Sequence, residues 1–157
     1  MTSPPLPPPP QVQQFQQFQQ PVPGPGRGTI AWAMGLAVLM CLPFVGSVLA
    51  SVLMITVGLS LRSKGGLAAR NGVHAANWGL TYLVLTVVLV GTHFGLLWYL
   101  TADDPDGIEG FFPFGLIITA WALVSLWHLV LCTWGIVASG QGRELRGTGL
   151  PVWRASA

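Results

Sequence analysis

Three long runs without a charged residue divide this chain, at residues 29–61, 71–102 and 110–141. A helix needs about 20 apolar residues to cross roughly 30 Å of hydrocarbon, and only helices and closed barrels satisfy their own backbone hydrogen bonds in lipid. The runs are unbroken and lack the apolar and polar alternation of barrel strands. They therefore predict an all-α fold, a polytopic membrane helix bundle.

The balance of residue types agrees with insertion in lipid. Hydrophobic residues make up 52% of the chain and charged residues only 8%, whereas soluble domains carry about 25% charged residues. The net charge of +2 is too small for the dense basic face that nucleic-acid binding requires. The expected partner is the lipid bilayer, and no nucleic-acid partner is expected.

The first 28 residues differ in composition from the rest of the chain. They hold nine of the 13 prolines and seven glutamines, and Arg27 is their only charge. Such a segment favours extended polyproline conformation and cannot bury enough apolar surface to offset its ordering entropy. We predict a disordered Pro/Gln-rich cytoplasmic tail at 1–28, a transmembrane helical domain at 29–141 and a cytoplasmic C-terminal tail at 142–157.

The first apolar run is too long for one straight crossing, because a single helix over it would measure about 50 Å. Pro43 removes a backbone donor and disfavours helix at Leu42, and Gly46 permits a turn. A break at Pro43 gives two short helices, the first of them a thin span or a re-entrant segment. One kinked span, and hence three passes, is the alternative. The four expected helices are about 30–42, 44–61, 73–99 and 111–138.

The placement of charges predicts the orientation in the cell membrane, because Lys and Arg are retained on the cytoplasmic side. Basic residues occupy the expected loop at 62–72 and the C-terminal tail, whereas the loop at 103–109 holds four of the five acids. A hairpin in the first run would place both termini in the cytoplasm. The predicted topology determinants are Arg62, Lys64, Arg70, Arg143 and Arg146.

Small residues four positions apart are candidates for close helix packing. Gly46 and Ala50 form one such pair, and Gly91 and Gly95 form another. This spacing puts both residues on one helix face, where neighbouring backbones can approach closely. We expect packing within the chain, with a contact between subunits as the alternative. Asn77, about one turn inside the interface, is expected to cap or bond the neighbouring helix.

Residues that often carry chemistry are sparse and isolated. His93 and His128 lie at different depths, so a shared haem is not expected, and each is predicted to be a neutral imidazole bonded to backbone or Thr. Cys41 and Cys132 stand alone in apolar runs and are expected to be small buried hydrophobes. The acidic residues 103–109 lack the spacing of an EF-hand loop and are expected to form a solvated turn.

The apolar runs carry no Lys, Arg, Asp or Glu, although pumps and ion-coupled transporters usually hold such a group at depth. No acid shares a membrane depth with a histidine that could activate a nucleophile. The sequence therefore predicts no catalytic, cofactor-binding or metal-binding residue, and we do not expect an enzyme.

The order of features resembles a known family of small bacterial integral membrane proteins, the domain of unknown function 4870. The resemblance rests on the sequence LPFVGS at 42–47, a basic loop, HAANW at 74–78 and the Gly149-Leu150-Pro151 group. It covers about residues 30–151. The family is distantly similar to a component of the chloroplast inner-envelope import machinery, which implies a four-helix layout with both ends on one side.

Two functions from different classes fit these features. A structural or interaction (scaffold) protein would anchor its tail and basic loops for membrane or cytoplasmic protein partners. The alternative is a channel or translocation subunit, a homo-oligomer that builds a pore through the face of Gly91 and Gly95.

Overall fold

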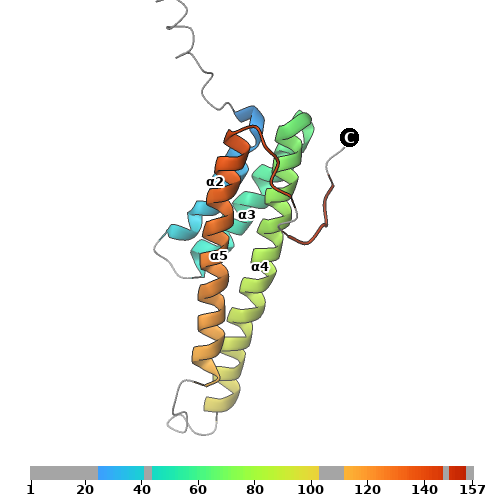
Figure 1. Ribbon diagram of the computed structural model, residues 1–157. Helices are drawn as coiled ribbons and strands as arrows, with labels where there is room; N and C mark the ends of the chain where they lie inside the picture. Colours follow the sequence, from blue (N-terminus) through green and yellow to red (C-terminus); the bar gives the residue numbers. More distant parts are fainter. Residues whose placement is uncertain (1–24, 41–43, 103–111, 147–148, 155–157) are drawn as a thin grey trace, which may run out of the picture.

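The computed structural model describes residues 25–40, 44–102, 112–146 and 149–154, and all of its regular elements are helices (Figure 1). Three of the helices are long, and a shorter helix at 29–39 precedes them. The elements in order are η1 (Pro25–Arg27), α2 (Thr29–Ala33), η2 (Met34–Leu39), α3 (Val45–Ser60), η3 (Leu61–Lys64), α4 (Gly66–Thr101) and α5 (Phe114–Gly140).

Three helices are long and apolar enough to cross a membrane: Val45–Lys64, Gly66–Thr101 and Phe114–Gly140. The helix Thr29–Leu39 is apolar but shorter. An apolar helix of this length does not cover the hydrocarbon thickness by itself, since 11 residues rise only about 17 Å. The chain is therefore a multi-pass membrane protein with three candidate spans.

The first apolar run folds back on itself as a helical hairpin. A Cβ added to Gly28 would stand 2.7 Å from the Cβ of Asn71, and one added to Gly72 would stand 3.0 Å from the Cβ of Leu61. The start of α2 and the end of α3 thus lie beside the same turn of α4. Met40 is extended and Phe44 has a positive φ of 64°, so the helix is interrupted there. The expected break point, Pro43, lies outside the described residues.

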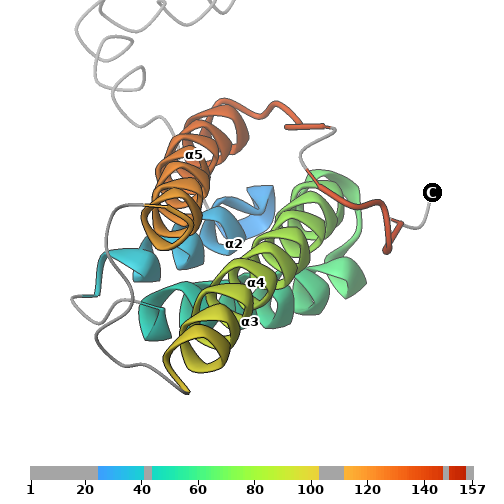
Figure 2. The same cartoon turned by 90° about the horizontal axis from the view of Figure 1, so that it is seen from below.

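The hairpin accompanies α4 and α5 over only part of their length (Figure 1). At its tip, the ring of Phe44 contacts the rings of Trp121 and Phe94, with centroids 4.6 and 6.1 Å apart. Helix α4 continues beyond Phe94 to Thr101. Seen along the bundle axis, α2 lies between α5 on one side and the pair α3 and α4 on the other (Figure 2).

Helix α4 begins at Gly66, whereas the expected crossing began near residue 73 and residues 62–72 were expected to form a loop. Residues 66–72 are instead helical, so that Arg70 lies within α4. The physical reason is packing: Ala68 and Ala69 in these first turns are each only 2% exposed. Hydropathy marks the stretch that suits hydrocarbon, whereas packing against neighbouring helices extends the helix beyond it.

Glycines set the close contact between α3 and α4. A Cβ added to Gly72 would stand 2.6 Å from the carbonyl oxygen of Gly58, and one added to Gly79 would stand 2.9 Å from the Cβ of Met54. Neither position has room for a side chain without a shift of its neighbours. Because lipid provides no hydrophobic drive between helices, this close approach supplies the dispersion contacts that hold the pair.

The predicted packing pairs have different surroundings. Ala50 is fully buried, and a Cβ added to Gly46 would lie 3.1 Å from the carbonyl oxygen of Val38 in the hairpin. Gly91 and Gly95 are exposed, and a Cβ added to either meets no atom of the described chain within 4 Å. The expectation that they pack inside the chain is therefore wrong for the described residues. That part of α4 extends past the hairpin, which leaves the face uncovered.

Candidate functional site

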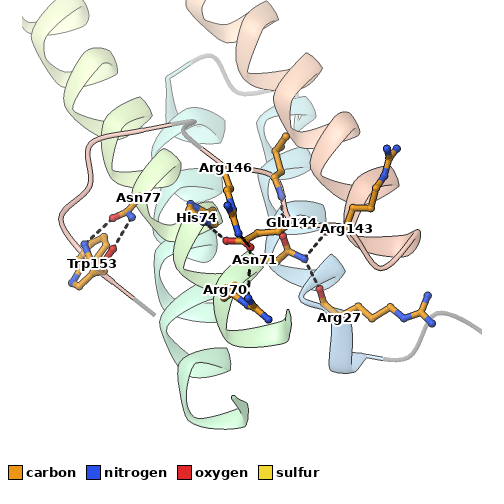
Figure 3. Close-up of polar contacts among 10 residues, drawn as sticks. Arg27, Arg70, Asn71, His74, Asn77, Arg143, Glu144, Arg146 and Trp153 are labelled. Atoms are coloured by element: carbon orange, nitrogen blue, oxygen red, sulfur yellow. Dashed lines mark hydrogen bonds and ion pairs between the residues drawn. The ribbon is translucent and has the colours of Figure 1, made fainter. Parts of the chain in front are cut away.

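Asn71 joins three segments that are far apart in the sequence. Its side chain is fully buried, and its Nδ2 group donates to the carbonyl oxygens of Arg27 and Arg143 at 3.0 and 3.1 Å. Its Oδ1 accepts from the backbone N–H of Leu145 at 3.2 Å. Figure 3 shows the amide between the two chain segments. One side chain therefore fixes the residues before α2 and those after α5 to helix α4.

Arg27 closes the end of α5. Its Nη1 donates to the carbonyl oxygen of Gly140 at 2.7 Å. The last carbonyls of a helix have no partner within the helix and carry partial negative charge, so a guanidinium is a favourable cap. A second hydrogen bond joins the same two parts of the chain: Oγ of Ser139 in α5 donates to Oγ1 of Thr29 in α2 at 3.1 Å. The residue that precedes the hairpin thus stabilises the helix that ends the bundle.

Glu144 is the centre of a small ionic cluster on the same end of the bundle. Its carboxylate lies 2.9 Å from Nε2 of His74, 2.9 Å from Nη2 of Arg146 and 4.0 Å from Nη1 of Arg70. The hydrogen bond from Arg146, with a further one from His74, lowers the pKa of the Glu144 carboxyl below its ordinary value. The same contact raises the pKa of Arg146. The carboxylate therefore stays charged and holds the tail against α4.

Asn77 binds the C-terminal tail and not the neighbouring helix, contrary to expectation. Its Nδ2 donates to the carbonyl oxygen of Trp153, and its Oδ1 accepts from the N–H of the same residue, both at 2.9 Å (Figure 3). One turn further along α4, Thr81 Oγ1 accepts from the N–H of Leu150 at 2.8 Å. A Cβ added to Gly149 would stand 2.7 Å from the carbonyl oxygen of Asn77, so the tail approaches the helix backbone closely.

We call this assembly the terminal cap: residues 25–28, 66–81, 141–146 and 149–154. The basic residues predicted to set the topology, Arg62, Lys64, Arg70, Arg143 and Arg146, all lie in the cap or in η3, which immediately precedes α4. The helix ends that flank the acidic segment, Thr101 and Phe114, lie at the opposite end of the bundle (Figure 1). The acidic segment itself, 103–109, lies outside the described residues.

A second polar cluster lies inside the bundle around His128, whose side chain is fully buried. Nδ1 accepts from the indole Nε1 of Trp78 at 3.1 Å, and Nε2 donates to the carbonyl oxygen of Gly35 at 3.0 Å. The ring stacks on Tyr82 with centroids 3.9 Å apart. Indole donates only, so this arrangement requires the neutral tautomer protonated on Nε2. The structure thus shows a histidine bonded to backbone, as expected.

Tyr82 connects this cluster to two serines. Its hydroxyl is 2.8 Å from Ser47 Oγ and 2.9 Å from Ser125 Oγ. Both serines line a cavity of about 470 Å³ under the hairpin tip, which is otherwise apolar and includes Phe44 and Trp121. The two serines therefore provide the hydroxyl groups in the lining of this cavity, which lies between the hairpin and α5.

His93 has no part in either cluster. Its ring meets the edges of Phe94 and Phe114, and its buried Nδ1 has no hydrogen-bond partner among the described residues. His93 and His128 are not brought together, and both ring nitrogens of His128 are engaged. Within the described ranges, no three His, Cys, Asp or Glu side chains are grouped to hold a metal ion.

Sequence inspection missed Asn71, Glu144 and the partners of His128. Two signals were available in retrospect: Asn71 precedes Asn77 by six residues in the same helix, and Glu144 is the one acid outside the 103–109 segment. Neither signal names a partner, because the partners come from other segments of the chain.

No protein-family model matches the chain, and no curated protein or solved structure is similar enough to register as a match. The resemblance to the domain of unknown function 4870 stays a prediction.

Proposed function

We propose that this protein is an integral membrane scaffold that presents both of its terminal segments at one membrane surface. The observation that carries this proposal is the position of Asn71, which bonds Arg27 at the end of the N-terminal tail and Arg143 at the start of the C-terminal tail. A buried amide with three partners is costly to leave unpaired. Both tails therefore leave the bundle at a fixed place.

We assign this surface to the cytoplasm. The described basic residues gather in the terminal cap and in η3, and Lys and Arg are retained on the cytoplasmic side of a membrane. On this orientation the hairpin enters from the cytoplasm and returns to it, and α4 and α5 make one crossing out and one back. Both termini are then cytoplasmic, as in the layout that the family resemblance implies.

The partner in this proposal is a cytoplasmic protein that binds residues 1–24. The proline run at 4–10 suits recognition in the polyproline conformation, which domains with aromatic grooves bind at low entropic cost. The scaffold needs no group that moves protons or ions through the bundle. It needs only a stable anchor for the tail.

Deletion of residues 1–24 tests the proposal, because this deletion keeps Arg27 and the whole terminal cap. We expect the shortened protein to insert in membranes and to unfold at the same temperature as the full chain, but to lose a protein that co-purifies in mild detergent. A matched control replaces the prolines at 4–10 with alanine and keeps the tail length. Co-purification of the same proteins with the full and shortened chains would contradict the scaffold proposal.

The second candidate, a pore-forming subunit, draws on the uncovered face of Gly91 and Gly95. This face is free for contact with another copy. Exposed residues near it are apolar, among them Val87, Val88 and Phe94, which favours contact with lipid or protein over a water-filled lining. Planar-bilayer recording of the purified protein distinguishes the two candidates, since the scaffold is expected to give no conductance at any voltage.

A further inference from the structure

The C-terminal tail lies along one polar face of α4 (Figure 1). Polar residues recur there at intervals of four, three and four positions, which places them on one side of the helix. They are Arg70, His74, Asn77 and Thr81. The first two contact Glu144, and the last two bond the backbone of residues 153 and 150. The tail therefore covers the polar stripe of a helix that is long and apolar enough to cross a membrane.

Residues 150–152 of the tail form a tight turn that carries only apolar side chains. The N–H of Val152 donates to the carbonyl oxygen of Leu150 at 2.8 Å, which closes the turn around Pro151. All three residues are exposed, Leu150 by 50% and Val152 by 56%. Turns in water are usually rich in Gly, Asn, Asp and Ser. The composition of this turn, which we call the apolar turn, is therefore unusual for contact with water.

Helix α4 holds the main chain on both sides of the apolar turn. Before it, the N–H of Leu150 donates to Thr81 Oγ1. After it, the amide of Asn77 makes two hydrogen bonds to the backbone of Trp153. A Cβ added to Gly149 would stand 2.7 Å from the carbonyl oxygen of Asn77, so the backbone lies close to the helix. The position of the turn along α4 is thus fixed, and its aliphatic side chains stay on the surface.

This position coincides with the edge of the hydrocarbon region. Trp98 and Tyr99, which are 81% and 76% exposed near the far end of α4, mark one membrane interface. Counted back from Tyr99, Thr81 lies about 27 Å and Asn77 about 33 Å along the helix. The hydrocarbon region is about 30 Å thick. The apolar turn, which α4 holds at these two residues, therefore lies at the opposite interface.

Helix α5 indicates a similar depth for that interface. Trp134 is 57% exposed, and it follows Phe114 by about 20 residues, or about 30 Å of helix. Phe114 begins α5 at the same end of the bundle as Thr101, the last residue of α4. Because Trp is enriched at both interfaces of a membrane, Trp134 marks the second one. The apolar turn and Trp134 thus belong to the same layer of the bilayer.

We propose that residues 149–154 are an interfacial anchor that binds anionic phospholipids. The apolar turn inserts at the boundary between headgroups and acyl chains, where exposed aliphatic side chains are favourable. Arg154 is exposed and directly follows the segment that Asn77 holds, so its guanidinium can reach a lipid phosphate. Glu144 is the one acid among the described residues, against seven Lys and Arg. This end of the bundle is therefore positive and complements anionic headgroups.

A spin label at residue 152 tests the depth of the anchor. The full chain without its two native cysteines is reconstituted in vesicles of equal parts phosphatidylglycerol and phosphatidylcholine. We expect the label to collide more often with oxygen, which concentrates in lipid, than with a water-soluble nickel chelate, at about 5–10 Å below the phosphates. Matched labels at Ser63, exposed in η3, and at Val87, which is 59% exposed in α4, give the aqueous and lipid limits.

Two results of this measurement would overturn the anchor. A label at residue 152 that collides with the nickel chelate as often as the label at Ser63 would place the turn in water. Few collisions with either reagent would mean that protein covers the turn, either a second copy or another partner. Comparison of all three labels in the same cysteine-free background separates these results from a general loss of the fold.

Hydrogen exchange tests the choice of lipid on the unaltered chain. Lipid that binds the docked tail makes its local opening rarer. We expect the peptide covering residues 149–154 to exchange at least about threefold more slowly in phosphatidylglycerol vesicles than in phosphatidylcholine vesicles. Arg154→Gln should abolish this difference, whereas the matched control Arg62→Gln, which changes an exposed arginine of η3, should keep it. Equal exchange in the two lipids, or a difference that survives Arg154→Gln, would overturn the assignment.

The anchor goes beyond the scaffold proposal, because it concerns lipid and residues 149–154 and not a protein partner of residues 1–24. The two therefore fail separately. Loss of the lipid effect in Arg154→Gln should leave co-purification with the N-terminal tail unchanged, and deletion of residues 1–24 should leave the depth of residue 152 unchanged.

Discussion

The side-chain amide of Asn77 pairs with the backbone of Trp153 through two hydrogen bonds, one to the carbonyl oxygen and one from the N–H, each 2.9 Å long. This is the pattern of donor and acceptor that a neighbouring strand would offer to an extended segment. Both bonds are made to main-chain atoms of Trp153 and neither to its indole side chain. The tail is therefore held at this point by its path along α4.

Replacement of Asn77 by alanine is expected to release the end of the tail. Two hydrogen bonds worth about 1 kcal/mol each are lost, and the amide hydrogen of Trp153 becomes free to exchange. Hydrogen exchange of the peptide covering residues 149–154 should become at least about fivefold faster. Thr81→Val is the matched comparison, because it removes the acceptor of the Leu150 N–H and the hydrogen bond that Thr81 donates to the carbonyl oxygen of Asn77, but keeps both bonds to Trp153. Unchanged exchange in Asn77→Ala would show that the tail is held by other contacts.

Replacement of Asn71 by leucine should destabilise the protein more than any change in the tail. The carbonyls of Arg27 and Arg143 and the N–H of Leu145 would lose their partner in a partly buried place. Unpaired buried groups cost about 1–3 kcal/mol each, and partial relaxation reduces the sum to about 3 kcal/mol. Thermal unfolding in detergent measures the change. A stability equal to that of the wild type would mean that Asn71 does not join the three segments.

Acid should detach the tail at Glu144. The pKa of its carboxyl is lowered in the docked state from an ordinary 4.5, mainly by the hydrogen bond from Arg146. The charged carboxylate therefore contributes fully to the stability of the docked tail above pH 4.5. This contribution is lost as the pH falls through the lowered pKa. A spin label at residue 152, in a chain without its two native cysteines, should become mobile only below that range.

Glu144→Gln serves as the control for this titration. The neutral amide cannot form the ion pair with Arg146, so the label should be more mobile at pH 7 and should lose its transition in acid. A transition of the same size in Glu144→Gln would assign the effect to another group.

Glycine to alanine changes should separate internal from external faces of α4. Gly72→Ala puts a methyl group 2.6 Å from the carbonyl oxygen of Gly58, and we expect a loss of about 1–3 kcal/mol from overpacking. Gly91→Ala meets no described atom within 4 Å and should leave the unfolding temperature of the monomer unchanged. If Gly91→Ala alters the oligomeric state, that face contacts another copy, as the pore candidate requires.

Some features of the fold follow from residue type alone. The uncharged runs predicted α3, α4 and α5. The excess length of the first run, with Pro43 and Gly46, predicted an interruption, which the structure shows at Met40 and Phe44. The start of α4 could not be predicted in this way, because Ala68 and Ala69 are buried by packing and not by lipid.

The sequence by itself determined whether each segment lies in lipid or in water, because transfer into lipid depends on the residues of a single run and not on the other runs. What only the tertiary structure decided is which polar groups meet. Asn71 and Arg27 are 44 residues apart, and His128 and Gly35 are 93 residues apart. An unpaired polar group in an apolar interior costs free energy, so most such groups have a partner. The identity of that partner depends on how the helices pack, which no local pattern encodes.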